Sequence, residues 1–121
     1  MYRSESEIEA VVRGFESCET DKAAFKHRDH LTVAVWYLQG ADRKTALDRM
    51  RTGLHRFLAH HGVASEKYSE TVTVYWIELI AEKLTELGPA TSLVDQCNYI
   101  LSLPAHKPAS RVEAEASPVK S

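Results

Sequence analysis

Residues 23–39 are apolar on nearly every side of a helix, and this property limits the possible folds more than any other feature of the sequence. The β-branched residues in this segment would also suit a strand. Its length and the recurrence of apolar residues at i, i+3 and i+4 favour a helix instead. Because a helix that is apolar all round needs other elements on most of its sides, we predict that residues 23–39 form the central helix of the fold.

Four further segments repeat their apolar residues with helical spacing, and glycine, proline or capping residues separate them. Ser4 and Glu7 form a capping-box pattern at the start of the first segment, and Asp42 is suited to cap the third. No segment alternates as a strand would. The sequence therefore predicts an all-α fold, a compact bundle of about five helices in one domain over residues 1–103. The expected helices cover residues 4–17, 23–39, 43–61, 66–87 and 92–103.

The charge and hydropathy of the chain argue against two classes of partner. Its 121 residues include 15 basic and 17 acidic residues, which give a formal net charge of -2. Nucleic-acid binding needs a concentrated basic surface, so we expect no nucleic-acid partner. No run of residues approaches the roughly 20 apolar residues that a membrane helix needs, so we expect no membrane association.

The N-terminal segment and the cysteines favour a cytoplasmic protein. The first residues lack a basic region followed by an apolar one, so we expect no secretory signal. Cys18 and Cys97 are far apart and outside any C-x-x-C pair, which argues against a disulfide scaffold and favours a reduced compartment. Residues 104–121 have little apolar content, so we predict a flexible tail that cannot offset its ordering entropy.

Six histidines are present, and three of them lie at the ends of apolar helix faces. His27 and His30 begin the apolar stripe of the second predicted helix, and their i, i+3 spacing puts both rings on one face. His61 ends the apolar stripe of the third. The remaining three have ordinary explanations on the surface or in the tail, and these are His55, His60 and His106.

The start of the fourth predicted helix adds polar residues to this set. Ser69 and Thr73 share a face there, and Glu70 lies beside them. Short connections make consecutive helices antiparallel neighbours, so the start of the second helix, the end of the third and the start of the fourth should meet. The sequence therefore predicts a polar pocket at one end of the bundle. Its expected residues are His27, His30, His61, Ser69, Glu70 and Thr73, with Tyr37 and Tyr68 as further hydroxyl groups for a substrate.

One interpretation of this pocket is a metal centre. Imidazole suits iron, zinc and copper, and a carboxylate added to histidines gives a ligand set with open positions. The predicted metal ligands are His27, His30, His61 and Glu70. On this hypothesis the protein is a small enzyme or binding protein that acts on a small molecule through a divalent transition metal.

Two alternatives need no metal. In the first, His27 or His30 and Glu70 are the catalytic residues, and they act as general base and acid on a bound small molecule. In the second, the histidines are structural and the chain is an interaction module without enzymatic activity. The sequence does not identify the substrate, and it leaves a homodimer open.

The segment Phe25–Leu31, followed by residues 68–73 and the pair Tyr75 and Trp76, resembles an uncharacterised family of small bacterial helical proteins. Members of this family share an F-x-H-x-x-H-L segment and a Y-H-E-T-x-T segment. The resemblance covers most of residues 5–87 and implies an all-helical fold, but no particular activity.

By this resemblance the two family histidines match His27 and His30, and the family Glu-Thr pair matches Glu70 and Thr71. The chain departs from the pattern at Ser69, where the family has a histidine. That position is expected to face the pocket, so the departure removes one candidate ligand or proton carrier from the metal hypothesis.

Overall fold

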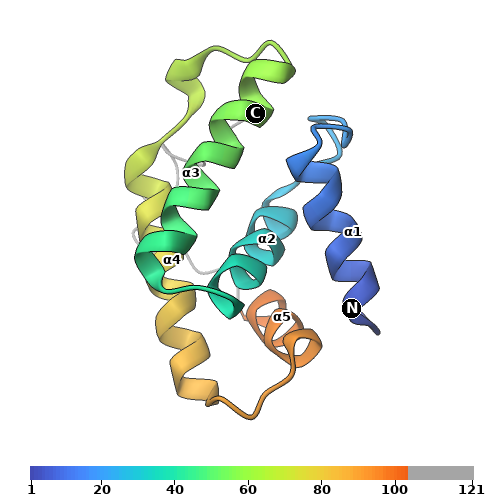
Figure 1. Cartoon of the computed structure of the whole chain (residues 1–121), viewed down its shortest axis with the longest axis vertical. Coiled ribbons are helices and arrows are strands. Elements are labelled where there is room, and N and C mark those ends of the chain that lie inside the picture. The colour runs from blue at the N-terminus through green and yellow to red at the C-terminus, as the bar shows by residue number, and fades with distance from the viewer. Residues whose placement is uncertain (104–121) are drawn as a thin grey trace.

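The computed structural model of the protein describes residues 1–103, which fold into α-helices and one short 3-10 helix (Figure 1). No strand occurs in these residues, so the predicted all-α fold is confirmed. The predicted flexible tail, residues 104–121, lies outside the described part of the chain. No helix in residues 1–103 has both the length and the apolar composition needed to cross a membrane. In chain order the elements are α1 (Glu5–Glu16), α2 (His27–Gln39), α3 (Arg43–His60), η1 (Ser65–Lys67), α4 (Glu70–Leu87) and α5 (Leu93–Ser102).

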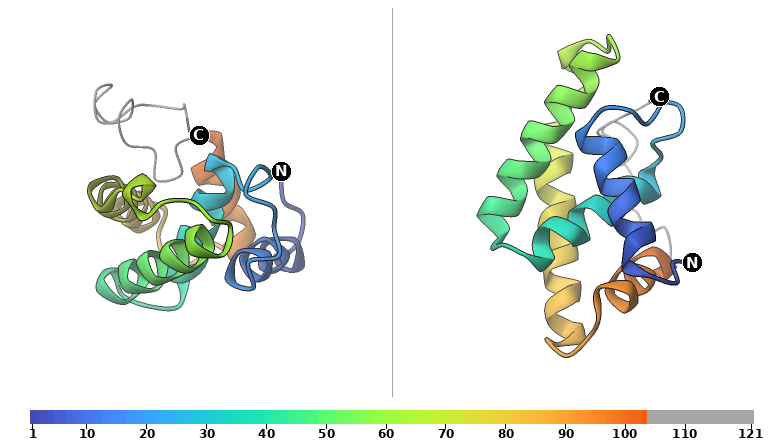
Figure 2. Two further views of the ribbon diagram at one scale, coloured as in Figure 1. Left: turned by 90° about the horizontal axis from the view of Figure 1, so that it is seen from above. Right: turned by 45° about the vertical axis from the view of Figure 1, so that its right-hand side comes forward.

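Helix α2 is the central helix, as its apolar sequence predicts. It packs against α1, α3, α4 and α5, which surround it (Figure 1). Seen from above, α3 and α4 lie side by side on one side of α2, and α1 lies on the other (Figure 2). The buried residues of α2 include two polar side chains near its start, His30 and Thr32. These polar groups are therefore in the interior, where burial is costly unless they are hydrogen-bonded.

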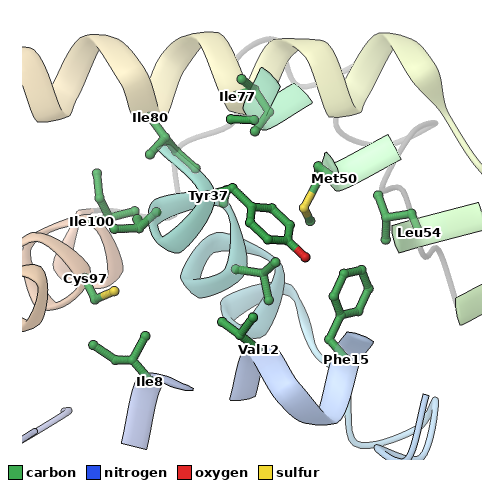
Figure 3. Close-up of a cluster of buried hydrophobic side chains, with 14 of the residues drawn as sticks. Ile8, Val12, Phe15, Tyr37, Met50, Leu54, Ile77, Ile80, Cys97 and Ile100 are labelled. Atoms are coloured by element: carbon green, nitrogen blue, oxygen red, sulfur yellow. The ribbon is translucent and has the colours of Figure 1, made fainter. Parts of the chain in front are cut away.

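An aromatic cluster joins α1, the α1–α2 loop and α3. Phe15 stacks on Phe25 with ring centroids 4.9 Å apart, and the ring of Phe57 lies 5.5 Å from Phe15 and 5.0 Å from Phe25. Both Phe15 and Phe57 are fully buried. Figure 3 shows part of the buried hydrophobic core, which continues from Phe15 towards α4 and α5 through Met50, Leu54, Ile77, Ile80, Cys97 and Ile100.

Two helices begin later than the sequence predicts, at residues 27 and 70 instead of 23 and 66. Before α2, the backbone N–H of Lys26 donates to Oδ2 of Asp29 at 2.9 Å, which fixes the first turn of the helix there. Before α4, the hydroxyl of Ser69 accepts from the backbone N–H of Val72 at 3.2 Å. The capping side chains set both starts, because they satisfy the N–H groups that a helix leaves unpaired at its beginning.

Gly53 lets α3 approach the aromatic cluster closely. A Cβ atom at this position would lie 2.6 Å from Cε2 and 2.9 Å from Cζ of Phe15. Replacing a glycine inside a helix by alanine ordinarily raises stability by up to about 1 kcal/mol. Gly53→Ala should instead lower the free energy of unfolding by about 1–3 kcal/mol, because the ring and the helix must move apart.

Urea denaturation of both proteins measures this effect. Thr52→Ala is the matched control, since residue 52 is an exposed position of the same helix. The control should not destabilise the protein, because alanine favours a helix and residue 52 is not in the core. A Gly53→Ala protein more stable than the wild type would show that α1 and α3 are not in close contact there.

Candidate functional site

His30 is a buried histidine with one ring nitrogen that lacks a partner. Its side chain is 7% exposed, and its Nδ1 lies 3.1 Å from the backbone oxygen of Lys26. Since a carbonyl oxygen only accepts hydrogen bonds, Nδ1 carries the hydrogen and donates it. Nε2 is then the unprotonated nitrogen. It is buried and has no hydrogen-bond partner among the described residues.

Burial also keeps the His30 ring uncharged. Loss of solvent is the main cause that lowers its pKa to about 3. The bond to Lys26 opposes this shift, and the nearby His27 adds to it. At neutral pH the ring is therefore a neutral hydrogen-bond acceptor. Because few buried polar atoms in native proteins lack a partner, the lone pair on Nε2 suggests a donor that residues 1–103 do not provide.

A small cavity lies beside His30, between α2, α3 and α4, and we call it the inner cavity. Its volume is about 20 Å³. This volume holds one water molecule or the end of a larger ligand, but not a whole substrate. Within the described part of the chain, its lining consists of His27, His30, Thr73, Trp76 and side chains that are aliphatic or thioether. The described lining residues are His27, His30, Leu31, Ala34, Met50, Leu54, Thr73, Trp76, Ile77 and Ile80.

A larger depression adjoins the inner cavity between α2, α4 and α5, and we call it the outer groove. Its volume is about 160 Å³, close to that of an engineered protein cavity that binds one benzene ring. The inner cavity and the outer groove share four lining residues, His27, Leu31, Trp76 and Ile80. The outer groove is further lined by Arg28, Leu79, Lys83, Ile100, Leu101 and Leu103.

His27 and Trp76 lie at the boundary between the two spaces. Helix α2 begins at His27, and Trp76 follows Thr73 by three residues on the same face of α4. The two rings meet edge to face with centroids 5.0 Å apart. The ring pair is therefore part of the walls of both the inner cavity and the outer groove.

Glu70 belongs to a separate polar network on the surface. Nε of Arg51 donates to Oε1 of Glu70 at 2.9 Å, and the hydroxyl of Tyr68 donates to the same oxygen at 2.7 Å. Arg51 also binds Asp48 on its own helix at 2.7 Å. The bonds from Arg51, and next those from Tyr68, lower the pKa of Glu70 to about 2. At neutral pH Glu70 is an ionised, paired carboxylate, which does not suit a general acid.

Removal of this charge should have little effect. Glu70 is 47% exposed, and solvent screens ion pairs at such positions, so Glu70→Gln should lower the free energy of unfolding by at most about 1 kcal/mol. It should leave ligand binding in the outer groove unchanged, because Glu70 lines neither space. Urea denaturation and the titrations described below measure the two effects. A binding defect without a loss of stability would place Glu70 in the site after all.

Other predicted site residues have structural partners. Thr73 lines the inner cavity, although its hydroxyl donates to the backbone oxygen of Ser69 at 2.9 Å. Ser69 caps the start of α4 with its own hydroxyl. Tyr37 is 4% exposed and donates its hydroxyl to Oε2 of Glu16 at 2.5 Å, on the side of α2 that faces α1. Thr73 therefore lines the inner cavity, whereas Ser69 and Tyr37 do not.

His61 lies at the far end of α3. Its ring packs against Phe57 with centroids 4.5 Å apart, and its Nε2 is buried without a partner among residues 1–103. Helix α3 has 18 residues and α2 has 13, so the end of α3 extends beyond the start of α2 (Figure 1). The short loops do place consecutive helices side by side, but His61 lines neither the inner cavity nor the outer groove.

Two of the four predicted metal ligands share the inner cavity. These are His27 and His30, whereas Glu70 is bound by Arg51 and His61 lies against Phe57. Nowhere in residues 1–103 do three or more His, Cys, Asp or Glu side chains gather closely enough to hold a metal ion. These side chains do not form the set of three protein ligands that catalytic metal centres use, and metal binding stays a prediction.

A larger depression of about 610 Å³ lies at the other end of α2 and α4. It is broad and open, and its charged groups already have partners. Asp42 caps α3 by accepting from the backbone N–H of Thr45 at 2.8 Å, and Arg43 is paired with Glu78. Gln96 lines it with a buried Oε1 that has no partner in the described chain, but both charged side chains of the described lining, Asp42 and Arg43, are already bound. We therefore place the candidate site at His30.

Among the described residues that line the outer groove, reasoning from sequence predicted His27 as a site residue and missed the others. Arg28 and Lys83 carry no signal of their own, because charged residues on helices usually face solvent. Trp76 shares a helical face with Thr73, which was a usable signal, yet an aromatic residue on such a face is ordinarily core. The contribution of α5 depends on how it packs against α2 and α4, which its periodicity does not show.

Comparison of the chain with protein-family models, with curated proteins and with solved structures found no match in any of the three. The resemblance to the small bacterial family with two histidine motifs therefore stays a prediction.

Proposed function

We propose that the chain binds a small, mainly apolar molecule that lies in the outer groove and donates a hydrogen bond to Nε2 of His30. The observation that carries this proposal is the Nε2 atom of His30, which is buried without a partner among residues 1–103. His30 lines the inner cavity, and the walls of this cavity are in part those of the outer groove. An O–H or N–H group of the ligand would supply the missing donor. The apolar body of the ligand would cover Leu31, Trp76 and Ile80.

The chemistry of His30 supports binding better than acid–base catalysis. A general base or acid works best with a pKa near the working pH, whereas the pKa of His30 is lowered to about 3. Glu70, the predicted partner in catalysis, is paired with Arg51 outside the cavity. We therefore propose a binding protein in preference to an acid–base enzyme, and we retain the bacterial cytoplasm as its expected location.

An interaction module has less support from the surface. Among residues 1–103, Met1 is the one large hydrophobic side chain that is exposed, at 78%. A partner protein that docked on this part of the chain would meet few apolar side chains, and such anchors dominate most interfaces. Structural roles for the histidines and a homodimer stay open as alternatives.

The proposal can be tested by NMR titration of the full chain with two probes that share a methyl-substituted benzene ring, p-cresol and toluene. p-Cresol carries a hydroxyl donor and toluene does not. We expect p-cresol to shift the indole N–H signal of Trp76 and the Nε2 signal of His30, with an affinity of roughly millimolar. The indole signal of Trp36 serves as an internal reference, because Trp36 lines neither space.

A pair of variants separates the His30 bond from general apolar binding. In the wild type, p-cresol should bind more tightly than toluene. In His30→Leu the two affinities should become similar, because the variant lacks the hydrogen-bond acceptor. His55→Leu makes the same substitution at an exposed position, and this variant should still bind p-cresol more tightly than toluene. If p-cresol shifts neither signal in the wild type, or still binds more tightly than toluene in His30→Leu, the proposal is wrong.

A further inference from the structure

We infer that the ligand of the outer groove carries a carboxylate, which Arg28 and Lys83 bind, so that the natural ligand is a small hydroxylated aromatic or aliphatic acid. This inference rests on the proposed function, because it assigns the opposite end of the same ligand. The hydroxyl end lies at His30 in the inner cavity. The acidic end lies where the groove meets solvent.

The charges around the outer groove favour an anion. Its described lining includes Arg28 and Lys83 as well as His27, and it includes no aspartate or glutamate. The whole chain carries more acidic than basic residues, with 17 against 15. A lining with basic residues and no acidic one is therefore a local departure from the chain as a whole. A groove with apolar walls and charges of one sign attracts a ligand of the opposite sign.

Neither basic side chain is held by a close ion pair with a described residue. The guanidinium of Arg28 lies 5.8 Å from the centre of the Tyr2 ring and forms no ion pair with a described residue. Nζ of Lys83 lies 3.8 Å from Oε1 of Glu86, near the upper limit for an ion pair. A carboxylate between them would form shorter, charge-assisted bonds, and arginine can bind a carboxylate with two parallel N–H groups.

Among the described residues, Glu86 is the acidic group paired with a basic residue of the groove, through its 3.8 Å contact with Lys83, and Arg28 has no such partner. Asp29 is the closest acidic residue to Arg28 in the sequence, but its Oδ2 accepts from the backbone N–H of Lys26 at 2.9 Å. Asp29 lines a different depression, together with Phe25 and Thr20. The start of α2 at His27 adds a weak positive potential, since the first N–H groups of a helix point outward there.

The size of the groove limits the ligand to about one ring. A volume of about 160 Å³ fits a benzene-sized body, and the walls are leucine, isoleucine and tryptophan side chains. A ligand with a hydroxyl at one end of such a body and a carboxylate at the other satisfies both polar ends. 4-Hydroxyphenylacetate is a probe of this class, and 4-hydroxyphenylacetamide has the same shape without the charge.

The experiment compares the two probes by NMR titration of the full chain. We expect the acid to bind about tenfold more tightly than the amide at low ionic strength, and added salt should reduce the difference. In the double variant Arg28→Gln/Lys83→Gln, the two affinities should agree within about twofold. Arg13→Gln/Lys44→Gln removes the same total charge from residues outside the groove and should preserve the preference.

The outcomes separate this inference from the proposed function. Equal binding of acid and amide to the wild type would overturn the anion assignment and leave the binding function in place. Failure of both probes to shift Trp76 and His30 would overturn both. If His30→Leu weakens the binding of the acid and of the amide by the same factor, the two ends of the ligand bind independently, as proposed.

One further variant tests whether the chain supplies its own anion. Glu113 and Glu115 lie beyond the described residues, and Glu113→Gln/Glu115→Gln neutralises both. We expect no change in the signals of Arg28 and Lys83 in this variant without added ligand. A change there would show that these carboxylates occupy the groove, and the inference of an external acid would be wrong.

Discussion

Replacing Phe57 by alanine should lower the free energy of unfolding by about 3–5 kcal/mol. The side chain is fully buried and contacts the rings of Phe15, Phe25 and His61. Its removal leaves a cavity where α1, α3 and the α1–α2 loop meet. Since domains are typically stable by only about 5–15 kcal/mol, this one substitution should remove a large part of the total.

Urea denaturation at pH 7 measures the loss, with the midpoint as the readout and an unchanged m-value as evidence that unfolding stays two-state. Phe57→Leu is the matched variant, because it keeps an apolar side chain of intermediate volume. It should cost clearly less than Phe57→Ala. If both variants lose less than about 1 kcal/mol, the aromatic cluster does not hold α1 against α3 as described.

Lowering the pH from 7 to 5 should reduce the free energy of unfolding of the wild type by roughly 2 kcal/mol through His30 alone. The pKa of His30 falls from 6.5 in the unfolded chain to about 3 in the folded one, because burial disfavours the charged ring. Between these values the unfolded chain binds a proton that the folded chain does not. Stability is therefore present above the unfolded pKa and is lost as the pH falls towards the folded one.

His30→Leu should flatten this dependence, because no proton can then bind at position 30. Denaturant titrations at pH 7 and pH 5 provide the comparison, and this range lies above the region where most carboxylates titrate. His60→Leu makes the same substitution at an exposed position of α3 and should keep the wild-type difference. An equal pH dependence in wild type and His30→Leu would mean that His30 is not buried as a neutral ring.

Much of the fold could be predicted because its signals are local. The apolar pattern of residues 23–39 indicated the central helix, and α2 does contact all four other α-helices. The capping pattern at Asp42 also marked a true helix start, where its side chain accepts from Thr45. The predicted starts at residues 23 and 66 were too early, because the helical pattern continues through a turn and a 3-10 helix that precede the real caps.

The candidate site could be predicted in part. His27, His30 and Thr73 were placed by helical spacing and short loops, and all three line the inner cavity. Glu70 was expected there too, but Arg51 of α3 draws its carboxylate into a surface network. The paired residues lie 19 positions apart on different helices, and the helical periodicity of the sequence does not indicate such a contact.

The sequence by itself determined which segments are helical, which faces are apolar and which histidines begin those faces, because helical periodicity and capping depend on residues a few positions apart. The tertiary structure decided which of those residues meet. The greater length of α3 carries His61 past the start of α2, and the packing of α5 against α2 opens the outer groove beside Trp76. Burial, which lowers the pKa of His30 and leaves its Nε2 without a partner, also arises only once the helices surround it.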